Sequence, residues 1–150
     1  TFTPVADAYV KSDEPAANFG RASSLRVRSG SQVVRSYLTF TVAGLTGPVA
    51  SAKLRLTATD PGLGGSVYIV PDTGWSETGV TYSSAPAMSG APLSSLGSVS
   101  TGQVVELDLG SAIAGNGTYS FALAGGGSDP VFYGSRESGT PPRLVLTLAP

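Results

Sequence analysis

The sequence contains no cysteine and no histidine. Without cysteine there is no disulfide framework, no thiolate nucleophile and no thiolate metal ligand. Without histidine there is no Ser-His-Asp triad, no Cys-His pair and no histidine-ligated zinc, and the usual general base at neutral pH is absent. Both absences argue against an enzyme that hydrolyses its substrate through an activated nucleophile.

The chain also lacks long hydrophobic segments and a strong charge of either sign. Its apolar runs are a few residues long, far short of the ~20 residues of a membrane-spanning helix, so we expect no membrane partner. No basic and apolar leader opens the sequence, and we expect any export signal to have been removed. The net charge of −1 and the pI of about 5.2 argue against nucleic acid as a partner.

Glycine and proline, in contrast, occur along the whole sequence. With 20 Gly, 11 Pro and 41% hydrophobic residues in 150 positions, the composition is typical of short strands joined by tight turns. A chain of this length buries roughly 70% of the surface that it exposes when unfolded, so it needs no disulfide or metal to fold. We predict one domain, residues 1–150, without a linker or an internal repeat.

Segments rich in Val, Leu, Thr and aromatic residues alternate with Gly, Pro, Ser and Asn clusters, which is typical of an all-β sandwich. We expect about ten strands. The clearest are Ala8–Val10, Ser24–Val27, Val34–Val42, Ala50–Thr57, Ser66–Pro71, Val104–Leu109, Thr118–Ala124, Val131–Gly134 and Arg143–Leu148. The longest stretch without a strong strand signal, 75–97, is predicted to be a loop.

Several of these strands alternate between apolar and charged residues, and alternate side chains of a strand point to opposite faces. We therefore expect five basic residues to point outward: Arg26, Arg28, Lys53, Arg55 and Arg143. If their strands are neighbours, they form a cationic stripe suited to uronate carboxylates, which arginine binds through forked hydrogen bonds. The alternative is that they pair across strands with Glu106 and Asp108 or only keep the sheet soluble.

Aromatic side chains offer a second route to sugar recognition, because a flat ring stacks on the apolar face of a pyranose. Tyr133, beside Gly134 and near Arg136 and Glu137, is the best candidate for an exposed ring. Trp75 is the only tryptophan. A single tryptophan in a sandwich is more often a packing anchor than a sugar platform.

The sequence also permits a structural Ca²⁺ ion as a cofactor, because Ca²⁺ binds carboxylate and carbonyl oxygens and needs neither His nor Cys. Suitable residues occur in three turn-like places: Asp13-Glu14 with Asn18, Asp60, and Asp129. Each is equally well explained as a turn-forming residue. The sequence has no EF-hand-like loop, and we assign no metal ligand.

Eight segments have a familiar composition and order. They are Asp7-Ala8-Tyr9-Val10, Asn18-Phe19-Gly20, Leu25-Arg26-Val27, Arg35–Phe40, Ser51–Leu56, Trp75–Tyr82, Ala85-Pro86 and Ser135-Arg136-Glu137. Together they resemble the DNRLRE domain family, which overlaps the alginate-binding carbohydrate-binding module family 96. The resemblance spans nearly the whole chain. One departure is Tyr82, where the family leads us to expect Trp.

The resemblance implies a jelly-roll-like antiparallel β-sandwich of a secreted bacterial protein, without catalytic residues. The recurrent residues of the family match Asp7, Asn18, Arg35, Leu38, Arg136 and Glu137. We expect these residues to form a structural network between the first and last strands, with Asp7 and Glu137 paired to Arg35 and Arg136, because buried charges need partners. The alternative is a ligand or calcium site made of the same residues.

The leading hypothesis is a non-catalytic, monomeric carbohydrate-binding module that targets an appended catalytic domain to a polysaccharide, with an anionic chain such as alginate preferred. The alternative is a structural or adhesive spacer on the cell surface that contacts protein or cell wall and exposes an apolar patch. A third is a small lyase or hydrolase that uses two of the ten carboxylates, although no base, nucleophile or metal signature stands out.

Overall fold

The computed structural model describes all 150 residues as ten β-strands and connecting loops, without a helix. The strands are β1 (Ala6–Lys11), β2 (Ser24–Val27), β3 (Val34–Val42), β4 (Val49–Asp60), β5 (Gly62–Val70), β6 (Ser89–Val99), β7 (Val104–Asp108), β8 (Gly117–Ala124), β9 (Val131–Gly134) and β10 (Arg143–Leu148). The all-β prediction is confirmed. No helix is long and apolar enough to cross a membrane.

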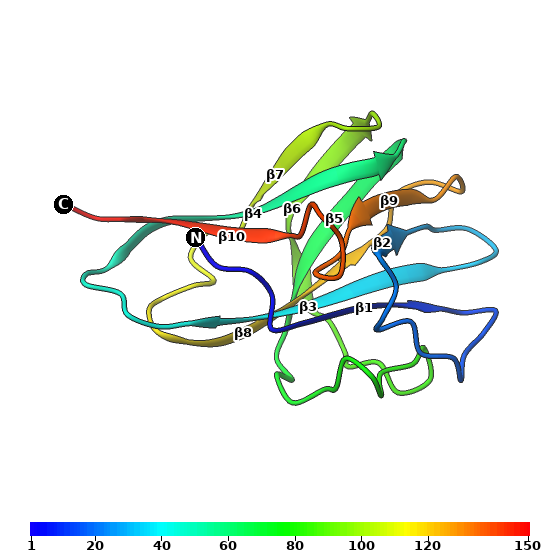
Figure 1. Cartoon of the computed structure of the whole chain (residues 1–150), viewed down its shortest axis with the longest axis horizontal. Helices are drawn as coiled ribbons and strands as arrows, with labels where there is room; N and C mark the ends of the chain where they lie inside the picture. The colour runs from blue at the N-terminus through cyan, green and yellow to red at the C-terminus, as the bar shows by residue number, and fades with distance from the viewer.

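The strands form two antiparallel sheets packed face to face (Figure 1). The first sheet has the order β1-β3-β8-β5-β6, and the second has the order β10-β4-β9-β2, with β7 paired to β4. Only the β5–β6 and β9–β10 connections stay within one sheet, and every other connection crosses to the opposite sheet. These crossings and the antiparallel pairing give the jelly-roll-like sandwich that the sequence predicts.

The space between the sheets is filled by the alternate apolar residues of the predicted strands. Leu25 and Val27 on β2 and Leu54 and Leu56 on β4 are at most 1% exposed. They belong to a cluster of 20 buried residues that also includes Phe121 of the first sheet. Full burial of one such side chain stabilises the fold by about 1.5–3 kcal/mol. The prediction that these side chains face inward is therefore confirmed.

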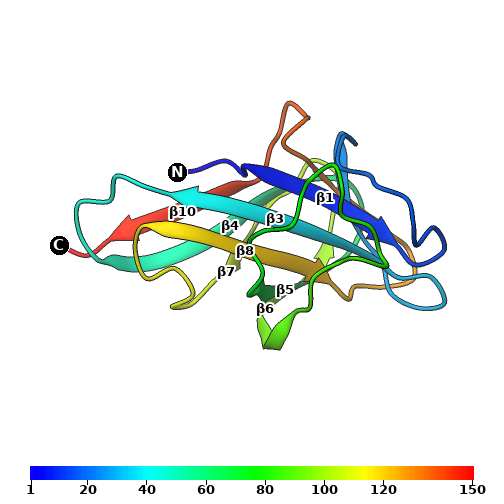
Figure 2. The same cartoon turned by 90° about the horizontal axis from the view of Figure 1, so that it is seen from below.

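A second, smaller core lies on the outer face of the first sheet, beneath the loop formed by residues 71–88 (Figure 2). Tyr37 of β3 and Val80 of the loop are buried there, and Trp75 packs against them. The Trp75 ring meets the Tyr37 ring edge-on at 6.1 Å between centroids, and its Nε1 donates to Ser120 Oγ at 3.2 Å. Trp75 is therefore a packing anchor, and it fixes the segment that carries Glu77.

Most of strand β6 lies within the stretch, 75–97, that we predicted to be a loop. It pairs with β5 at the edge of the first sheet, and most of its side chains are exposed or half-buried on both faces. Pro92 and the small polar residues of β6 suit an edge strand, where unpaired backbone groups face solvent. The prediction was wrong here because β6 contacts the core only through Leu93, Leu96 and Val99, and this spacing of three gives no alternation of apolar and polar residues.

Candidate functional site

The five basic residues expected to point outward lie on one sheet but do not form one stripe. They are Arg26 on β2, Arg28 just beyond it, Lys53 and Arg55 on β4, and Arg143 on β10. Strand β9 separates β2 from β4, and Arg26 lies opposite Phe132, which in turn lies opposite Asp60. Asp60 is five residues from Arg55, which is roughly 16 Å along a strand. The predicted stripe is therefore divided into two groups.

The group on β4 and β10 is partly neutralised by acidic residues of β7. Arg55 donates from Nε and Nη2 to Glu106 Oε2 at 3.0 and 2.9 Å, and Lys53 is the register partner of Asp108. Arg143 lies opposite Arg55 on the other side of β4. Arg55 therefore follows the alternative that we left open, an ion pair across strands. Such an exposed ion pair contributes only about 0–1 kcal/mol to the stability of the fold.

The group at β2 lines a pocket of about 320 Å³, which we call the basic pocket. Its lining residues are Lys11, Arg26, Arg28, Gln32, Val34, Ser128, Pro130 and Phe132. Three of them are cations, and none carries a carboxylate. The volume is at the lower end of the range of about 300–1,000 Å³ that small-ligand pockets occupy.

Two backbone carbonyls hold the guanidinium of Arg28 in the basic pocket. Its Nε donates to the Ser128 carbonyl at 2.7 Å, and its Nη1 donates to the Gln32 carbonyl at 2.6 Å. The Nη2 atom makes no hydrogen bond within the chain. Since two of the three nitrogens are fixed, the third is oriented before any ligand arrives, which reduces the entropy lost on binding.

Aromatic rings hold the other two cations. The Arg26 guanidinium lies over the rings of Phe132 and Tyr9, at 4.2 and 4.8 Å from their centroids. Tyr9 stacks on Phe19 at 4.5 Å, and Lys11 Nζ lies 5.7 Å from the Phe19 centroid. Each cation–π contact contributes about 0.5–1 kcal/mol at an exposed site. Arg26 has no acidic partner, and Lys11 has only Asp13, whose Oδ1 lies 4.0 Å from Lys11 Nζ.

Tyr133 is not part of this surface. It is fully buried in the main core, and its hydroxyl donates to the Gly64 carbonyl at 2.8 Å. Burial raises the pKa of this phenol above its ordinary value near 10. The prediction that Tyr133 is exposed was wrong because the alternation of β9 turns Phe132, its neighbour in sequence, toward the outer face and the basic pocket.

Asp7, Asn18, Arg136 and Glu137 come together as expected, but Glu77 takes the place in the ion pair that we predicted for Asp7 or Glu137. Asp7 Oδ2 accepts the backbone N–H of Arg136 at 2.9 Å, and the backbone N–H of Asp7 donates to Glu77 Oε1 at 3.0 Å. Arg136 Nη1 lies 3.1 Å from both carboxylate oxygens of Glu77, and this contact raises the pKa of the arginine. These contacts join β1 to loop 71–88 and to the segment after β9.

Asn18 belongs to this network, and Arg35 does not. The Asn18 amide donates to the carbonyls of Glu77 and Val80 at 2.9 and 2.7 Å, which fixes the backbone that carries Glu77. The Arg35 guanidinium instead lies over the Tyr82 ring, 5.2 Å from its centroid, and forms no ion pair. The predicted pairing of Arg35 with an acid was therefore wrong, because an aromatic ring of the loop is its partner.

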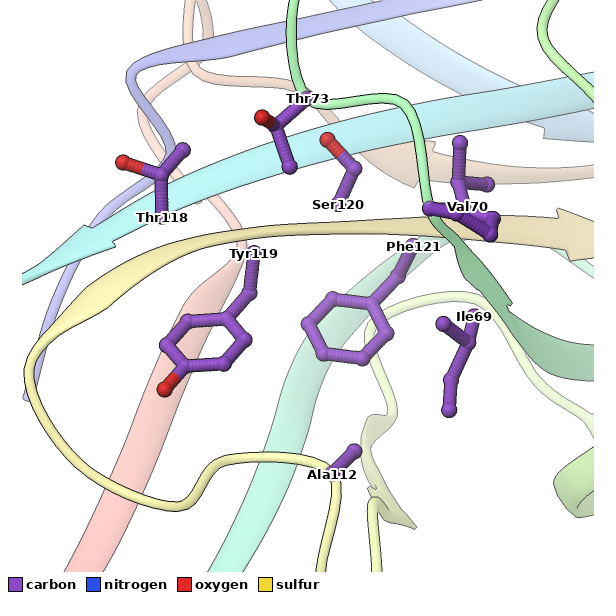
Figure 3. A pocket seen from close by; sticks show the side chains of 9 residues that line it. Ile69, Val70, Thr73, Ala112, Thr118, Tyr119, Ser120 and Phe121 are labelled. Carbon is purple, nitrogen blue, oxygen red and sulfur yellow. The ribbon is translucent and has the colours of Figure 1, made fainter.

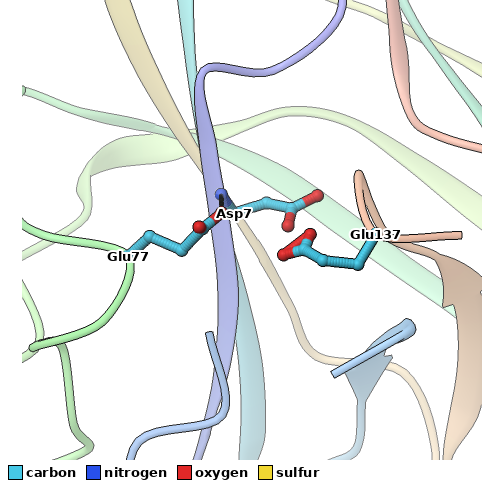
Figure 4. A group of neighbouring side chains, drawn as sticks. All are labelled: Asp7, Glu77 and Glu137. Carbon is cyan, nitrogen blue, oxygen red and sulfur yellow. Dashed lines mark hydrogen bonds between the residues drawn. The ribbon is translucent and has the colours of Figure 1, made fainter. Parts of the chain in front are cut away.

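Glu137 lies beside the other two acids of the network rather than in an ion pair of its own. One carboxylate oxygen from each of Asp7, Glu77 and Glu137 lies within 4.8 Å of the others (Figure 4). Burial raises the pKa of Asp7 to about 7, and the charges of Glu137 and Glu77 add to this effect, although the Arg136 N–H opposes it. Burial and the Glu77 charge also raise the pKa of Glu137.

The positions that the sequence suggested for Ca²⁺ do not come together. Asp13 is 4.0 Å from Lys11 Nζ, and the Asn18 oxygen accepts the Gly20 N–H at 3.0 Å. Asp60 and Asp129 are exposed, and neither belongs to a group of three neighbouring acidic side chains. The cluster of Asp7, Glu77 and Glu137 is the only such group in the chain.

An apolar hollow of about 150 Å³ lies over β8, beside Ile69, Tyr119 and Phe121 (Figure 3). No charged residue lines it. The Tyr119 hydroxyl is already used, since it donates to the Gly115 carbonyl at 2.8 Å. The hollow therefore offers less than the basic pocket for binding a charged ligand.

Comparison with known proteins agrees with the resemblance read from the sequence. The sequence model of carbohydrate-binding module family 96 matches residues 1–148. No curated protein matches the chain.

Proposed function

The chain belongs to carbohydrate-binding module family 96, and from this premise we propose that it binds an anionic polysaccharide, a uronate polymer such as alginate, in the basic pocket. The family supports a polysaccharide ligand and a non-catalytic role. The observation that carries the anionic preference is the presence of three cations and no carboxylate in the lining of one pocket.

The chemistry of the basic pocket fits a uronate better than a neutral sugar. Arg26 keeps both Nη groups as a fork that matches the two oxygens of a carboxylate, and Arg28 adds the oriented Nη2 as a further donor. Lys11 adds a third positive charge from β1, while Pro130 and Phe132 give the pocket an apolar wall for the face of a pyranose ring. A neutral glycan would gain the wall but leave the cations without partners.

The decisive experiment compares two pairs of arginine and lysine variants by affinity electrophoresis through gels that contain alginate, pectin, xylan or cellulose. Arg26→Ala and Arg28→Ala remove cations from the basic pocket, and we expect each to weaken retardation by alginate or pectin at least tenfold. Lys53→Ala and Arg143→Ala are matched controls, since both side chains are exposed on the same sheet but outside the pocket. We expect these controls to bind as the wild type does.

The outcomes separate this proposal from its rivals. If Arg143→Ala abolishes binding and Arg28→Ala does not, the ligand occupies the group on β4 and β10 instead. If no glycan retards the wild type, the spacer hypothesis replaces the proposal. Its predicted apolar patch has little support, because the large exposed hydrophobics Val5, Leu63 and Val104 lie on different segments. Unsaturated uronate or reducing sugar released by the purified domain would indicate a lyase or hydrolase.

We further infer that the domain acts as a monomer in a secreted protein and holds an appended catalytic domain on its polymer. A binding module raises the local concentration of a linked enzyme, so its benefit depends on a polymeric substrate. Deletion of this domain from the full-length protein should reduce activity on polymer severalfold and leave activity on short soluble oligosaccharides unchanged. Equal loss on both substrates would contradict this role.

A further inference from the structure

The cluster of Asp7, Glu77 and Glu137 has more negative charge than its surroundings neutralise. Three carboxylates meet there, and Arg136 is the only cation that contacts them. When all three acids are ionised, two negative charges stay uncompensated beside a buried residue, and unpaired charge in such a place is costly. A divalent cation carries the charge that is missing.

One atom of the cluster points to a ligand independently of the charge count. Asp7 is 1% exposed, and its Oδ1 is buried without a hydrogen-bond partner, whereas its Oδ2 accepts the Arg136 N–H. Leaving a buried acceptor unsatisfied costs about 1–3 kcal/mol, and more for a charged group. The Asp7 carboxylate points toward that of Glu137 in Figure 4, so the side chain that carries the unpaired oxygen is directed into the cluster.

From these observations we propose that Asp7, Glu77 and Glu137 bind a Ca²⁺ ion that ties β1 to loop 71–88 and to the segment after β9. Oxygens that bind one Ca²⁺ ion lie 2.3–2.6 Å from it, so two of them are separated by at most about 5 Å. The three carboxylate oxygens lie within 4.8 Å of one another, which meets this limit.

The donor set selects the kind of cation. All three side chains offer oxygen, and the chain has no His or Cys, so the site suits a hard ion rather than Zn²⁺ or Cu²⁺. Mg²⁺ requires a near-ideal octahedron, whereas Ca²⁺ accepts six to eight oxygens in flexible geometry. Glu137 is exposed, and water molecules can therefore complete the shell on that side.

The proposal can be tested on the purified domain without any polysaccharide, because uronate polymers bind Ca²⁺ themselves. Calorimetric titration of CaCl₂ into chelator-stripped protein should show one site, with MgCl₂ binding more weakly. At a hundredfold excess of Ca²⁺ over its Kd, the melting temperature should rise by about 5–10 °C over that in chelator. No heat and no thermal shift with CaCl₂ would overturn the proposal.

A matched pair of glutamate variants locates the ion. Glu137→Gln removes an exposed carboxylate of the cluster and should abolish the thermal shift. Glu14→Gln removes an exposed carboxylate beside Asp13, where the sequence alone suggested a site, and should keep the full shift. The reverse pattern, or an undiminished shift in Glu137→Gln, would overturn the assignment.

The Asp7→Asn variant tests whether Asp7 binds the cation or has only a structural role. Its amide oxygen can still accept the Arg136 N–H, and the change removes one charge of the repelling set. In chelator we expect Asp7→Asn to melt at or above the temperature of the wild type, with no further rise when CaCl₂ is added. A variant that is destabilised in chelator and still responds fully to Ca²⁺ would contradict the proposal. Alginate binding in the presence of chelator tests the basic pocket separately.

Discussion

Two buried tyrosines differ in one hydrogen bond, and this difference predicts opposite effects of the same substitution. Tyr133 and Tyr37 are both fully buried. The Tyr133 hydroxyl donates to the Gly64 carbonyl at 2.8 Å, whereas the Tyr37 hydroxyl has no partner. Tyr133→Phe leaves a buried carbonyl unsatisfied and should lower the free energy of unfolding by about 1–3 kcal/mol. Tyr37→Phe removes an uncompensated hydroxyl and should leave stability unchanged or raise it by up to about 2 kcal/mol.

Thermal and urea unfolding at pH 7 measure both changes. For a chain of this length, 1 kcal/mol corresponds to about 2–4 °C in melting temperature, so Tyr133→Phe should melt about 2–12 °C below the wild type. Its retardation by alginate should be unchanged, because its side chain does not reach the basic pocket. The reasoning is refuted if Tyr133→Phe melts with the wild type and Tyr37→Phe is the destabilised variant.

Four further predictions concern the pH dependence of stability, the backbone beside Glu77, one surface ion pair and the salt dependence of binding. The folded-state pKa of Tyr133 is raised, so its contribution to stability is full below about pH 10 and is lost at higher pH; urea unfolding from pH 8 to 11 should show this loss, reduced in Tyr133→Phe. A Cβ at Gly20 would overlap the Glu77 carbonyl, whereas one at Gly97 meets nothing, so Gly20→Ala but not Gly97→Ala should lower both the melting temperature and the Ca²⁺-dependent shift. Arg55→Ala breaks an exposed ion pair and should change the unfolding free energy by no more than about 1 kcal/mol in denaturant titration. Alginate binding should weaken as NaCl rises from 50 to 500 mM in affinity electrophoresis, and salt-independent binding would contradict an ionic contact.

The strands and the inner faces were predictable from sequence because they depend on local alternation. Leu54 and Leu56 are buried and Lys53 and Arg55 point outward because side chains of one strand alternate between faces. The same rule places Phe132 outside and Tyr133 inside. From the sequence we predicted the wrong one of the two to be exposed, since both are aromatic and either could face the core.

The partners of the charged residues depend on which strands become neighbours, and alternation carries no information on that. Arg26 is separated from Arg55 because β9 lies between β2 and β4. Glu77 reaches Asp7 because loop 71–88 folds back over the first sheet, anchored by Trp75. The signal for Glu77 was present in the segment Trp75-Ser76-Glu77, which resembles the family pattern, but no spacing rule connects it to a residue 70 positions away.

One face of β1 connects the two proposed sites. Ala8 and Val10 point into the smaller core, so the alternate residues Asp7, Tyr9 and Lys11 share the opposite face. Asp7 belongs to the acidic cluster, Lys11 lines the basic pocket, and Tyr9 between them contacts Arg26. Four residues of strand span about 13 Å, too far for a direct contact between Ca²⁺ and the sugar. We therefore expect the proposed ion and the proposed sugar to bind at separate places, with β1, from which Lys11 and Tyr9 project, as the link between them.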